Sequence, residues 1–310
     1  MTAAARARNA YIGVACALIS SIGFSGKTII IKLAYQYQVD PITLLALRML
    51  CALPFFLAMA WWAGGGDSRM TRRDWISIIA LGFTGYYVGS YLDFAGLQYI
   101  SAGLGRLILY LFPTVVVVFS ALFLKQPIRA RHFASLALSY GGIALVFWHE
   151  VSTGDDLSLT LLGAGLVFAS AVTYAIYLIA GSGIVHKLGS MRFSAYASTS
   201  ASFFVLAHFT ATHGPAQLVV AHEVYALALL MAVASTVLPV WLMAEGLKRV
   251  GANQASLVAS IGPISTLALA HFFLGEPVTG FQLAGAAMVL AGVLLVSLKA
   301  ESAPAHSSRQ

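Results

Sequence analysis

The sequence predicts an all-α integral membrane protein with ten transmembrane helices arranged as two inverted five-helix repeats. Its composition, its series of apolar segments and an internal repeat each support this prediction. Only 9% of the 310 residues are charged and 59% are hydrophobic, whereas a soluble domain carries about 25% charged residues. Because lipid offers no hydrogen bonds to the backbone, apolar segments of about 20 residues are expected to span it as helices.

Ten apolar segments follow one another between clusters of turn-forming or charged residues. They cover 11–32, 41–63, 75–97, 101–124, 131–149, 158–182, 191–212, 223–245, 251–274 and 279–299. We expect each of these segments to cross the membrane once, with residues 301–310 forming a disordered cytoplasmic tail.

Lysine and arginine are distributed unevenly between the loops. With the N-terminus placed inside, 14 of the 18 basic residues fall in inner segments. They are Arg6, Arg8, Arg69, Arg72, Arg73, Lys125, Arg129, Arg131, Lys187, Arg192, Lys248, Arg249, Lys299 and Arg309. Cytoplasmic loops carry an excess of basic residues, so both termini are expected in the cytoplasm. The basic residues form no stripe or tail, which argues against a nucleic-acid partner.

The repeat appears when the sequence is shifted by 150 residues. Residues 96–146 then align with 246–296 without a gap and share 13 identities in 51 positions. Pro113 meets Pro263, and Pro127 meets Pro277. Five helices per half is an odd number, so the halves, 1–150 and 151–300, must face opposite ways. Inverted repeats are typical of secondary transporters, which bind substrate near the bilayer midplane between the halves.

The chain resembles the ten-helix EamA branch of the drug/metabolite transporter superfamily. The resemblance covers nearly all of residues 10–300. It rests on the stretch 96–102, on Leu111-Phe112-Pro113, on Leu124-Lys125-Gln126-Pro127 and on Leu274-Gly275-Glu276-Pro277. In the first half Lys125-Gln126 replaces the family's usual Gly-Glu turn. The resemblance implies transport of a metabolite across a bacterial inner membrane, with no cofactor, and leaves the substrate open.

Four charged residues lie inside apolar segments and away from their ends, where a charge costs about 2.5–3.5 kcal/mol on insertion scales. They are Lys27, Arg48, Asp93 and Arg106. Such residues usually face a cavity or a partner. Lys27 is expected to contact either a substrate anion or Asp93. Arg48 is interpreted as structural, because it resembles a residue found widely in the family.

Helical spacing places further residues on the faces of these charges. Arg106 shares a face with Tyr110 and Pro113, and Asp93 shares one with Tyr86 and Ser90. Arg106 would bind a substrate carboxylate or neutralise Asp93, and Asp93 would hold a substrate amine, a proton or a basic side chain.

The second half is less charged, and we expect it to supply apolar or aromatic walls of the substrate pocket. Trp241 is a candidate substrate contact, and no His, Cys or Asp cluster has the spacing of metal ligands. Pro113 and Pro263 interrupt their helices, which suits hinges. The pocket predicted from these residues is cationic on one side and apolar on the other.

These observations predict a secondary transporter for a small amphipathic metabolite, most directly an amino acid or related carboxylate, with export favoured. The predicted mechanism is alternating access through a central cavity, and a proton carried by Asp93 is a further candidate partner. Other metabolites and drugs remain alternatives, as does a channel or a scaffold without transport.

An intramembrane serine protease is a rival from another class. Gly23-Phe24-Ser25-Gly26 matches a short Gly-x-Ser-Gly pattern, and His271 would have to act as the base. Half of the pattern is glycine, in a chain with 28 glycines, so chance explains the match better. We therefore expect a protein that is not an enzyme.

Overall fold

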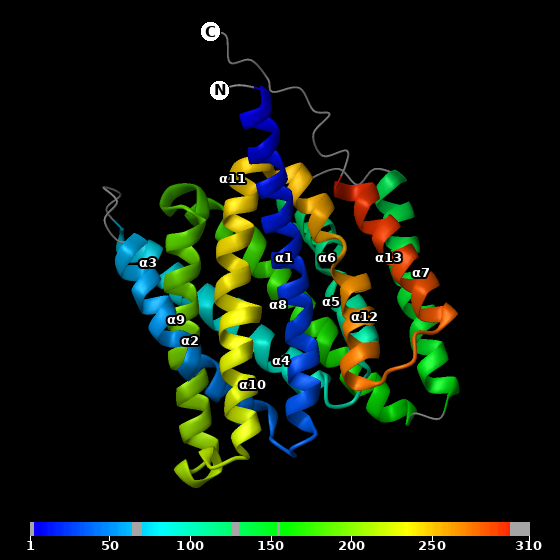
Figure 1. Ribbon diagram of the computed structural model, residues 1–310, viewed down its shortest axis with the longest axis horizontal. Helices are drawn as coiled ribbons and strands as arrows, with labels where there is room; N and C mark the ends of the chain where they lie inside the picture. The colour runs from blue at the N-terminus through cyan, green and yellow to red at the C-terminus, as the bar shows by residue number, and fades with distance from the viewer. Residues whose placement is uncertain (1–2, 64–69, 126–129, 154–155, 298–310) are drawn as a thin grey trace.

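The computed structural model describes residues 3–63, 70–125, 130–153 and 156–297, and all the regular structure in these ranges is helical (Figure 1). The tail at 301–310, expected to be disordered, lies outside the described residues. So do Arg69, Arg129, Lys299 and Arg309, four of the basic residues that set the expected orientation.

The first half of the chain folds into a series of helical elements. They are α1 (Ala3–Tyr35), α2 (Pro41–Ala63), α3 (Arg72–Leu81), the π-helix η1 (Gly82–Val88), α4 (Gly89–Gly96), α5 (Ala102–Leu109), α6 (Phe112–Leu124) and α7 (Ala130–Ser152). The elements α3, η1 and α4 follow one another without a break and form one rod.

The second half has a similar series of elements. They are α8 (Leu157–Leu188), α9 (Ser190–Thr212), the short 3₁₀-helix η2 (Pro215–Leu218), α10 (His222–Ala232), the π-helix η3 (Val233–Val237), α11 (Leu238–Ala259), α12 (Gly262–Leu274) and α13 (Gly280–Ser297). This half has an added 3₁₀-helix, η2, and one helix, α11, in the positions of α4 and α5. Within α11 the backbone leaves helical geometry at Gly251, where φ is 80° and ψ is 169°.

Six helical stretches of the described residues are long and apolar enough to cross a membrane. They are Arg8–Tyr35, Pro41–Trp62, Arg72–Gly96, Ala102–Phe123, Leu157–Val185 and His222–Met243. Two shorter apolar helices cover Gly262–Leu274 and Gly280–Leu295. The chain is therefore an all-helical, multi-pass membrane protein.

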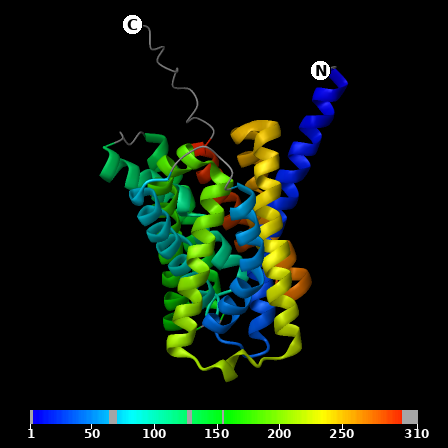
Figure 2. The same cartoon turned by 90° about the vertical axis from the view of Figure 1, so that its left-hand side faces the viewer.

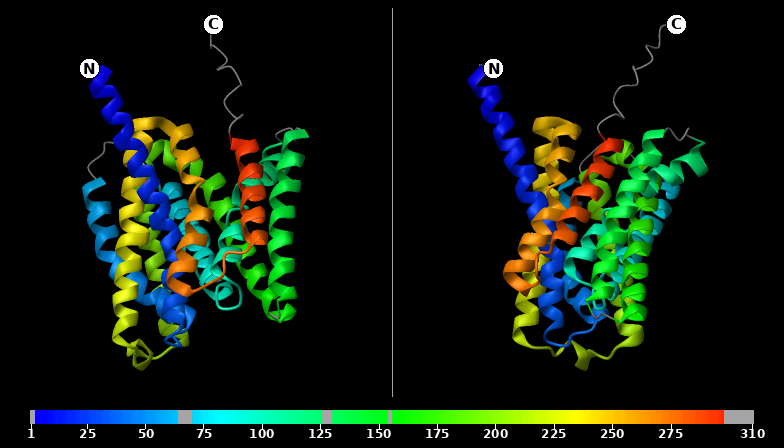
Figure 3. Two further views of the ribbon diagram at one scale, coloured as in Figure 1. Left: turned by 45° about the vertical axis from the view of Figure 1, so that its right-hand side comes forward. Right: turned by 90° about the vertical axis from the view of Figure 1, so that its right-hand side faces the viewer.

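The most extensive contacts join helices from different halves of the chain. They are the pairs α1 with α11, α7 with α13, α2 with α9, and α4 with α8. The pairs α1–α11 and α7–α13 lie side by side at opposite sides of the bundle in Figures 1 and 3. The first turns of α1 extend beyond the bundle (Figure 2). Since each half packs mainly on the other, the two halves form one body.

Hydrogen bonds between the halves recur at the 150-residue offset. The Ser20 hydroxyl donates to the carbonyl oxygen of Pro239 over 2.7 Å, and the Ser170 hydroxyl donates to that of Gly89 over 2.7 Å. Ser170 follows Ser20 by 150 positions, and Pro239 follows Gly89 by 150. The 150-residue offset was found from identities in 96–146 and 246–296. It therefore also relates residues outside these two ranges.

Close helix approaches recur at the same offset. A Cβ added to Gly96 would lie 2.7 Å from the carbonyl oxygen of Gly163, and one added to Gly246 would lie 3.0 Å from that of Gly13. Only glycine lets two backbones come this close. These glycines bring α4 against α8 and α11 against α1.

Local backbone features also coincide at this offset. The π-helices η1 and η3 occupy overlapping repeat positions, since residues 82–88 correspond to 232–238. Lys125 ends α6 in the left-handed conformation (φ 54°, ψ 29°), and Gly275 ends α12 in the same way (φ 69°, ψ 15°). In Figure 1, α1 begins at the top and α8 begins at the bottom, so these equivalent helices run in opposite directions.

Candidate functional site

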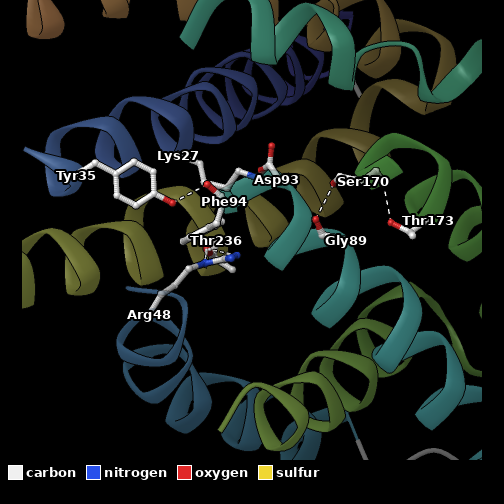
Figure 4. A network of polar contacts seen from close by, with 9 residues as sticks. All are labelled: Lys27, Tyr35, Arg48, Gly89, Asp93, Phe94, Ser170, Thr173 and Thr236. Carbon is white, nitrogen blue, oxygen red and sulfur yellow. Dashed lines mark hydrogen bonds and ion pairs between the residues drawn. The ribbon is translucent and has the colours of Figure 1, made fainter. Parts of the chain in front are cut away.

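The buried charges meet between α1, α2, α4 and α5. Lys27 Nζ on α1 lies 2.7 Å from Asp93 Oδ2 on α4, with side-chain exposures of 17% and 4% (Figure 4). Of the partners left open by the sequence, the structure pairs Lys27 with Asp93. The pair is an internal salt bridge between α1 and α4.

Arg48 on α2 joins the same region. Its side chain is buried, and Nε and Nη2 lie 3.3 and 3.1 Å from the hydroxyl oxygen of Thr236 in η3. Its guanidinium carbon lies 5.7 Å from the centre of the Phe94 ring, next to Asp93. The contact crosses from the first half to the second, as Figure 4 shows. Nothing in the sequence paired Arg48 with Thr236, because they stand 188 positions apart.

Arg106 on α5 lies against aromatic and backbone groups. The residue is buried, and its guanidinium carbon lies 5.0 Å from the centre of the Tyr110 ring. Its Nη2 would be 3.2 Å from a Cβ on Gly262, the first residue of α12. Arg106 therefore faces the beginning of a helix from the other half, where backbone N–H groups carry partial positive charge.

Tyr110 closes the gap left by a proline. Pro263 has no backbone N–H, so it cannot bond the carbonyl four residues earlier, at Ala259. That carbonyl accepts hydrogen bonds from the Tyr110 hydroxyl and from the Ser21 hydroxyl, each over 2.9 Å. The break between α11 and α12 is thus held by side chains of α1 and of the segment after α5.

The two candidate hinge prolines occupy matching places in the structure. Pro113 lies in the first turn of α6 and Pro263 in the first turn of α12. The residues before these helices, Leu111 and Ile261, have nearly the same backbone angles: φ −73° and ψ −13°, and φ −67° and ψ −12°. Each proline thus follows a break that separates two helical segments.

Tyr86 and Ser90 lie close to Asp93 in the chain but sit in different kinds of helix. Tyr86 belongs to η1, and its ring packs edge-on against Tyr177 of α8 with 5.1 Å between centres. Ser90 lies in the first turn of α4 and is partly buried. Because a π-helix has more residues per turn than an α-helix, the α-helical period does not carry through Tyr86. The contact with Tyr177, rather than helical spacing, shows which way the Tyr86 side chain points.

Trp241 stands apart from the charged cluster. It is 45% exposed on α11. Within the described residues, Trp241 has no hydrogen bond, ring contact or ion pair with Lys27, Asp93 or Arg106. Its role as a substrate wall therefore remains a prediction from the sequence.

A cavity of about 560 Å³ opens beside the end of α1. Its lining residues are mostly polar and include Lys32, Tyr35, Gln36, Gln98 and Glu276. Tyr35 donates a 2.6 Å hydrogen bond to the carbonyl of Phe94, the neighbour of Asp93. The cavity thus borders the elements that carry the Lys27–Asp93 salt bridge, and it gives them a polar vestibule at one end of the bundle.

The serine of the protease-like pattern is engaged in packing contacts. Ser25 is fully buried, and its hydroxyl lies 2.9 Å from the carbonyl oxygens of Ser21 and Gly262. His271 lies on the surface with Nδ1 3.0 Å from the carbonyl oxygen of Glu276. Ser25 therefore serves the α1–α12 interface. The described residues contain no group of three or more His, Cys, Asp or Glu side chains placed to hold a metal ion.

Comparison with known proteins agrees with the fold and the repeat. The model of the EamA-like transporter family matches residues 11–148 and again 161–298, an offset of 150 residues. YcbK of Bacillus subtilis (strain 168), named an uncharacterized transporter, is 30% identical over 287 residues, which cover 90% of each chain. YyaM of the same organism, also named an uncharacterized transporter, is 26% identical over 88% of this chain and 90% of its own.

A solved crystal structure shares the fold. It superposes with a TM-score of 0.61 at 17% identity and covers 90% of this chain and 96% of the solved one. At this identity the likeness concerns the fold alone. With the two family matches and the relatives named as transporters, the conclusion about the chain itself is direct: it belongs to the EamA-like transporter family.

Proposed function

We propose that this protein is a secondary transporter that moves a small carboxylate-bearing metabolite, an amino acid or a related compound, across the bacterial inner membrane. The observation that carries the proposal is the charge of the buried cluster. Three cationic side chains, Lys27, Arg48 and Arg106, come together with one carboxylate, Asp93. A substrate carboxylate would supply the missing negative charge.

The charge of the cluster matters because the membrane interior has low polarity. A cation on a spanning helix is unfavourable there unless it has a partner or reaches water. Asp93 neutralises Lys27 and leaves the two arginines. Arg48 contacts the Thr236 hydroxyl and the Phe94 ring, and Arg106 contacts the Tyr110 ring. A bound anion would stabilise the conformation in which the cluster binds it. A substrate can shift the equilibrium between conformations only through such a difference in affinity.

The proposed mechanism is alternating access by ten spanning helices in two inverted repeats, 1–150 and 151–300. The paired hydrogen bonds of Ser20 and Ser170, and the double match of the family model, support it. The substrate would bind between the halves, with Pro113 and Pro263 as hinges. Tyr86, Ser90, Tyr110 and Trp241 would complete its pocket beside the charges.

Net export and the cytoplasmic placement of both termini belong to the same proposal. The start of α1 and the end of α13 lie on one side of the bundle in Figure 1, and the α9–α10 connection lies on the other. The basic residues Arg73 and Lys187 flank the terminal side. The positive-inside rule assigns that side to the cytoplasm.

Cysteine labelling in intact cells tests this topology. Cys16 and Cys51 are the chain's two cysteines and would first be replaced by Ala. We expect a membrane-impermeant maleimide to label Gln217→Cys in intact cells, and to label Arg73→Cys only after the cells are opened. Labelling of Arg73→Cys from outside would overturn the orientation, and labelling of both from outside would overturn the ten-span arrangement.

Counterflow in proteoliposomes tests the substrate. Vesicles loaded with one unlabelled amino acid or carboxylate would take up the same labelled compound, with and without a pH gradient. Saturable counterflow marks a carrier, and an effect of the gradient that disappears in Asp93→Asn would assign the proton to Asp93. If no amino acid or carboxylate exchanges, and none competes, the proposed substrate class is wrong.

A further inference from the structure

The two buried arginines each keep one hydrogen-bond donor unused. Arg48 is 6% exposed and Arg106 is 8% exposed. Arg48 Nη1 and Arg106 Nε are buried without a hydrogen-bond partner in the described part of the chain. Leaving a buried donor unsatisfied costs about 1–3 kcal/mol, and more for charged groups, so each position favours an acceptor brought by a ligand.

The guanidinium groups are held in place by contacts from different elements. Thr236 in η3 fixes Arg48 through Nε and Nη2, and the Tyr110 ring supports Arg106 beside the start of α12. Lys27 lies within electrostatic range of both arginines. The arginines extend from different helices, α2 and α5, and each has its own buried donor without a partner among the described residues.

The net charge of the cluster also favours a ligand with two negative charges. Lys27, Arg48 and Arg106 contribute three positive charges and Asp93 contributes one negative charge, so the cluster carries +3 − 1 = +2. The other buried acid among the described residues, Glu150, lies at the end of α7, where it accepts a hydrogen bond from Ser101. Two negative charges are therefore needed for neutrality.

We propose that the transported substrate carries two carboxylates, one bound at Arg48 and the other at Arg106. This inference rests on the proposed function and narrows its substrate class to small dicarboxylates with a net charge of −2. A guanidinium recognises a carboxylate through paired, charge-assisted hydrogen bonds. The partial positive charge at the start of α12 favours an anion beside Arg106.

The decisive comparison uses two probes that differ by one charge. Succinate has two carboxylates, and succinamate has the same chain with one carboxylate replaced by an amide. Binding to the purified full-length protein in detergent would be measured by titration calorimetry at pH 7.5. Succinate is expected to bind at least tenfold more tightly than succinamate, because succinamate leaves one arginine unpaired.

Variants then assign the two carboxylates to the two arginines. Arg48→Gln and Arg106→Gln should each weaken succinate binding at least tenfold. Only one of them should weaken succinamate binding, since its single carboxylate occupies one arginine. Arg249→Gln is the matched control, because Arg249 pairs with Glu245 within α11, shortly before the break at Gly251 and outside the cluster. It should leave both affinities unchanged.

Each outcome bears on the inference. Equal affinities for succinate and succinamate, or an affinity for chloride as high as that for succinate, would overturn it. If an arginine variant fails to fold, the two-probe comparison on the wild-type protein still decides. If monocarboxylates bind and depend on Arg106 while dicarboxylates gain nothing, the inference fails and the proposed function stands. If no carboxylate binds at all, the proposed function fails as well.

Discussion

Ser20 and Ser170 make the same contact in the two halves of the molecule. Each hydroxyl donates a 2.7 Å hydrogen bond to a backbone carbonyl of the other half, Ser20 to Pro239 and Ser170 to Gly89. Donors and acceptors are each 150 positions apart. The interface thus contains two copies of one contact, as a duplicated chain folding on itself would produce. The stability of this interface is open to direct test.

The close approach of α4 and α8 should depend on Gly163. A methyl group there would lie 2.8 Å from the carbonyl oxygen of Gly96 and 2.8 Å from Tyr99 Cβ. Gly163→Ala should therefore destabilise the protein by roughly 1–3 kcal/mol, the usual range for overpacking. The measurement is the midpoint of thermal unfolding in detergent.

Gly165 provides the matched control two residues along the same helix. A Cβ at this position meets nothing within 4 Å. Gly165→Ala should leave the unfolding midpoint unchanged or raise it, because alanine favours a helix by about 1 kcal/mol over glycine. Equal losses in both variants would mean that the Gly96–Gly163 approach does not set the packing of α4 on α8.

The helix ends at Lys125 and Gly275 allow an exchange between the repeats. Both residues are left-handed, and their N–H groups donate to Ser120 and Ala270, which occupy equivalent positions. Lysine is strained in this conformation and glycine is not. We expect Lys125→Gly to raise the free energy of unfolding by about 1 kcal/mol and Gly275→Ala to lower it by about 1 kcal/mol. Chemical denaturation in mixed micelles would measure both changes, and a loss of stability in Lys125→Gly would contradict the shared geometry.

The Lys27–Asp93 salt bridge should show strong coupling between its partners. Lys27→Met leaves a buried carboxylate without its cation, which costs about 3–5 kcal/mol. The double variant Lys27→Met/Asp93→Leu removes both charges and should recover most of that loss. A double-mutant cycle on the unfolding midpoint gives the coupling energy. Additive effects would mean that the two side chains do not stabilise one another.

Much of the fold could be predicted from the sequence because the signals were local. Each of the ten apolar segments is helical over most of its length, and the segment at 41–63 coincides with α2. The repeat could be found from turn residues and prolines, whose backbone preferences are strong. The π-helices η1 and η3 could not, since an extra residue in a helical turn leaves no pattern in composition.

The site was predictable in part. Burial of a charge in an apolar segment singled out Lys27, Asp93 and Arg106, and the structure places the first two in one salt bridge. The partner of Arg48 could not be predicted, because the contact with Thr236 depends on how η3 packs against α2. Helical spacing grouped Tyr86 with Asp93, but the π-helix makes the position of Tyr86 a matter of tertiary structure.

The central claim is that a substrate carboxylate binds the buried cationic cluster, and its most direct test is transport by Arg106→Gln. The initial rate of labelled substrate uptake would be measured in proteoliposomes with equal amounts of wild-type protein, Arg106→Gln and Arg249→Gln. The account predicts that Arg106→Gln lowers the rate at least tenfold while Arg249→Gln retains it. Uptake by Arg106→Gln at the wild-type rate would contradict the account.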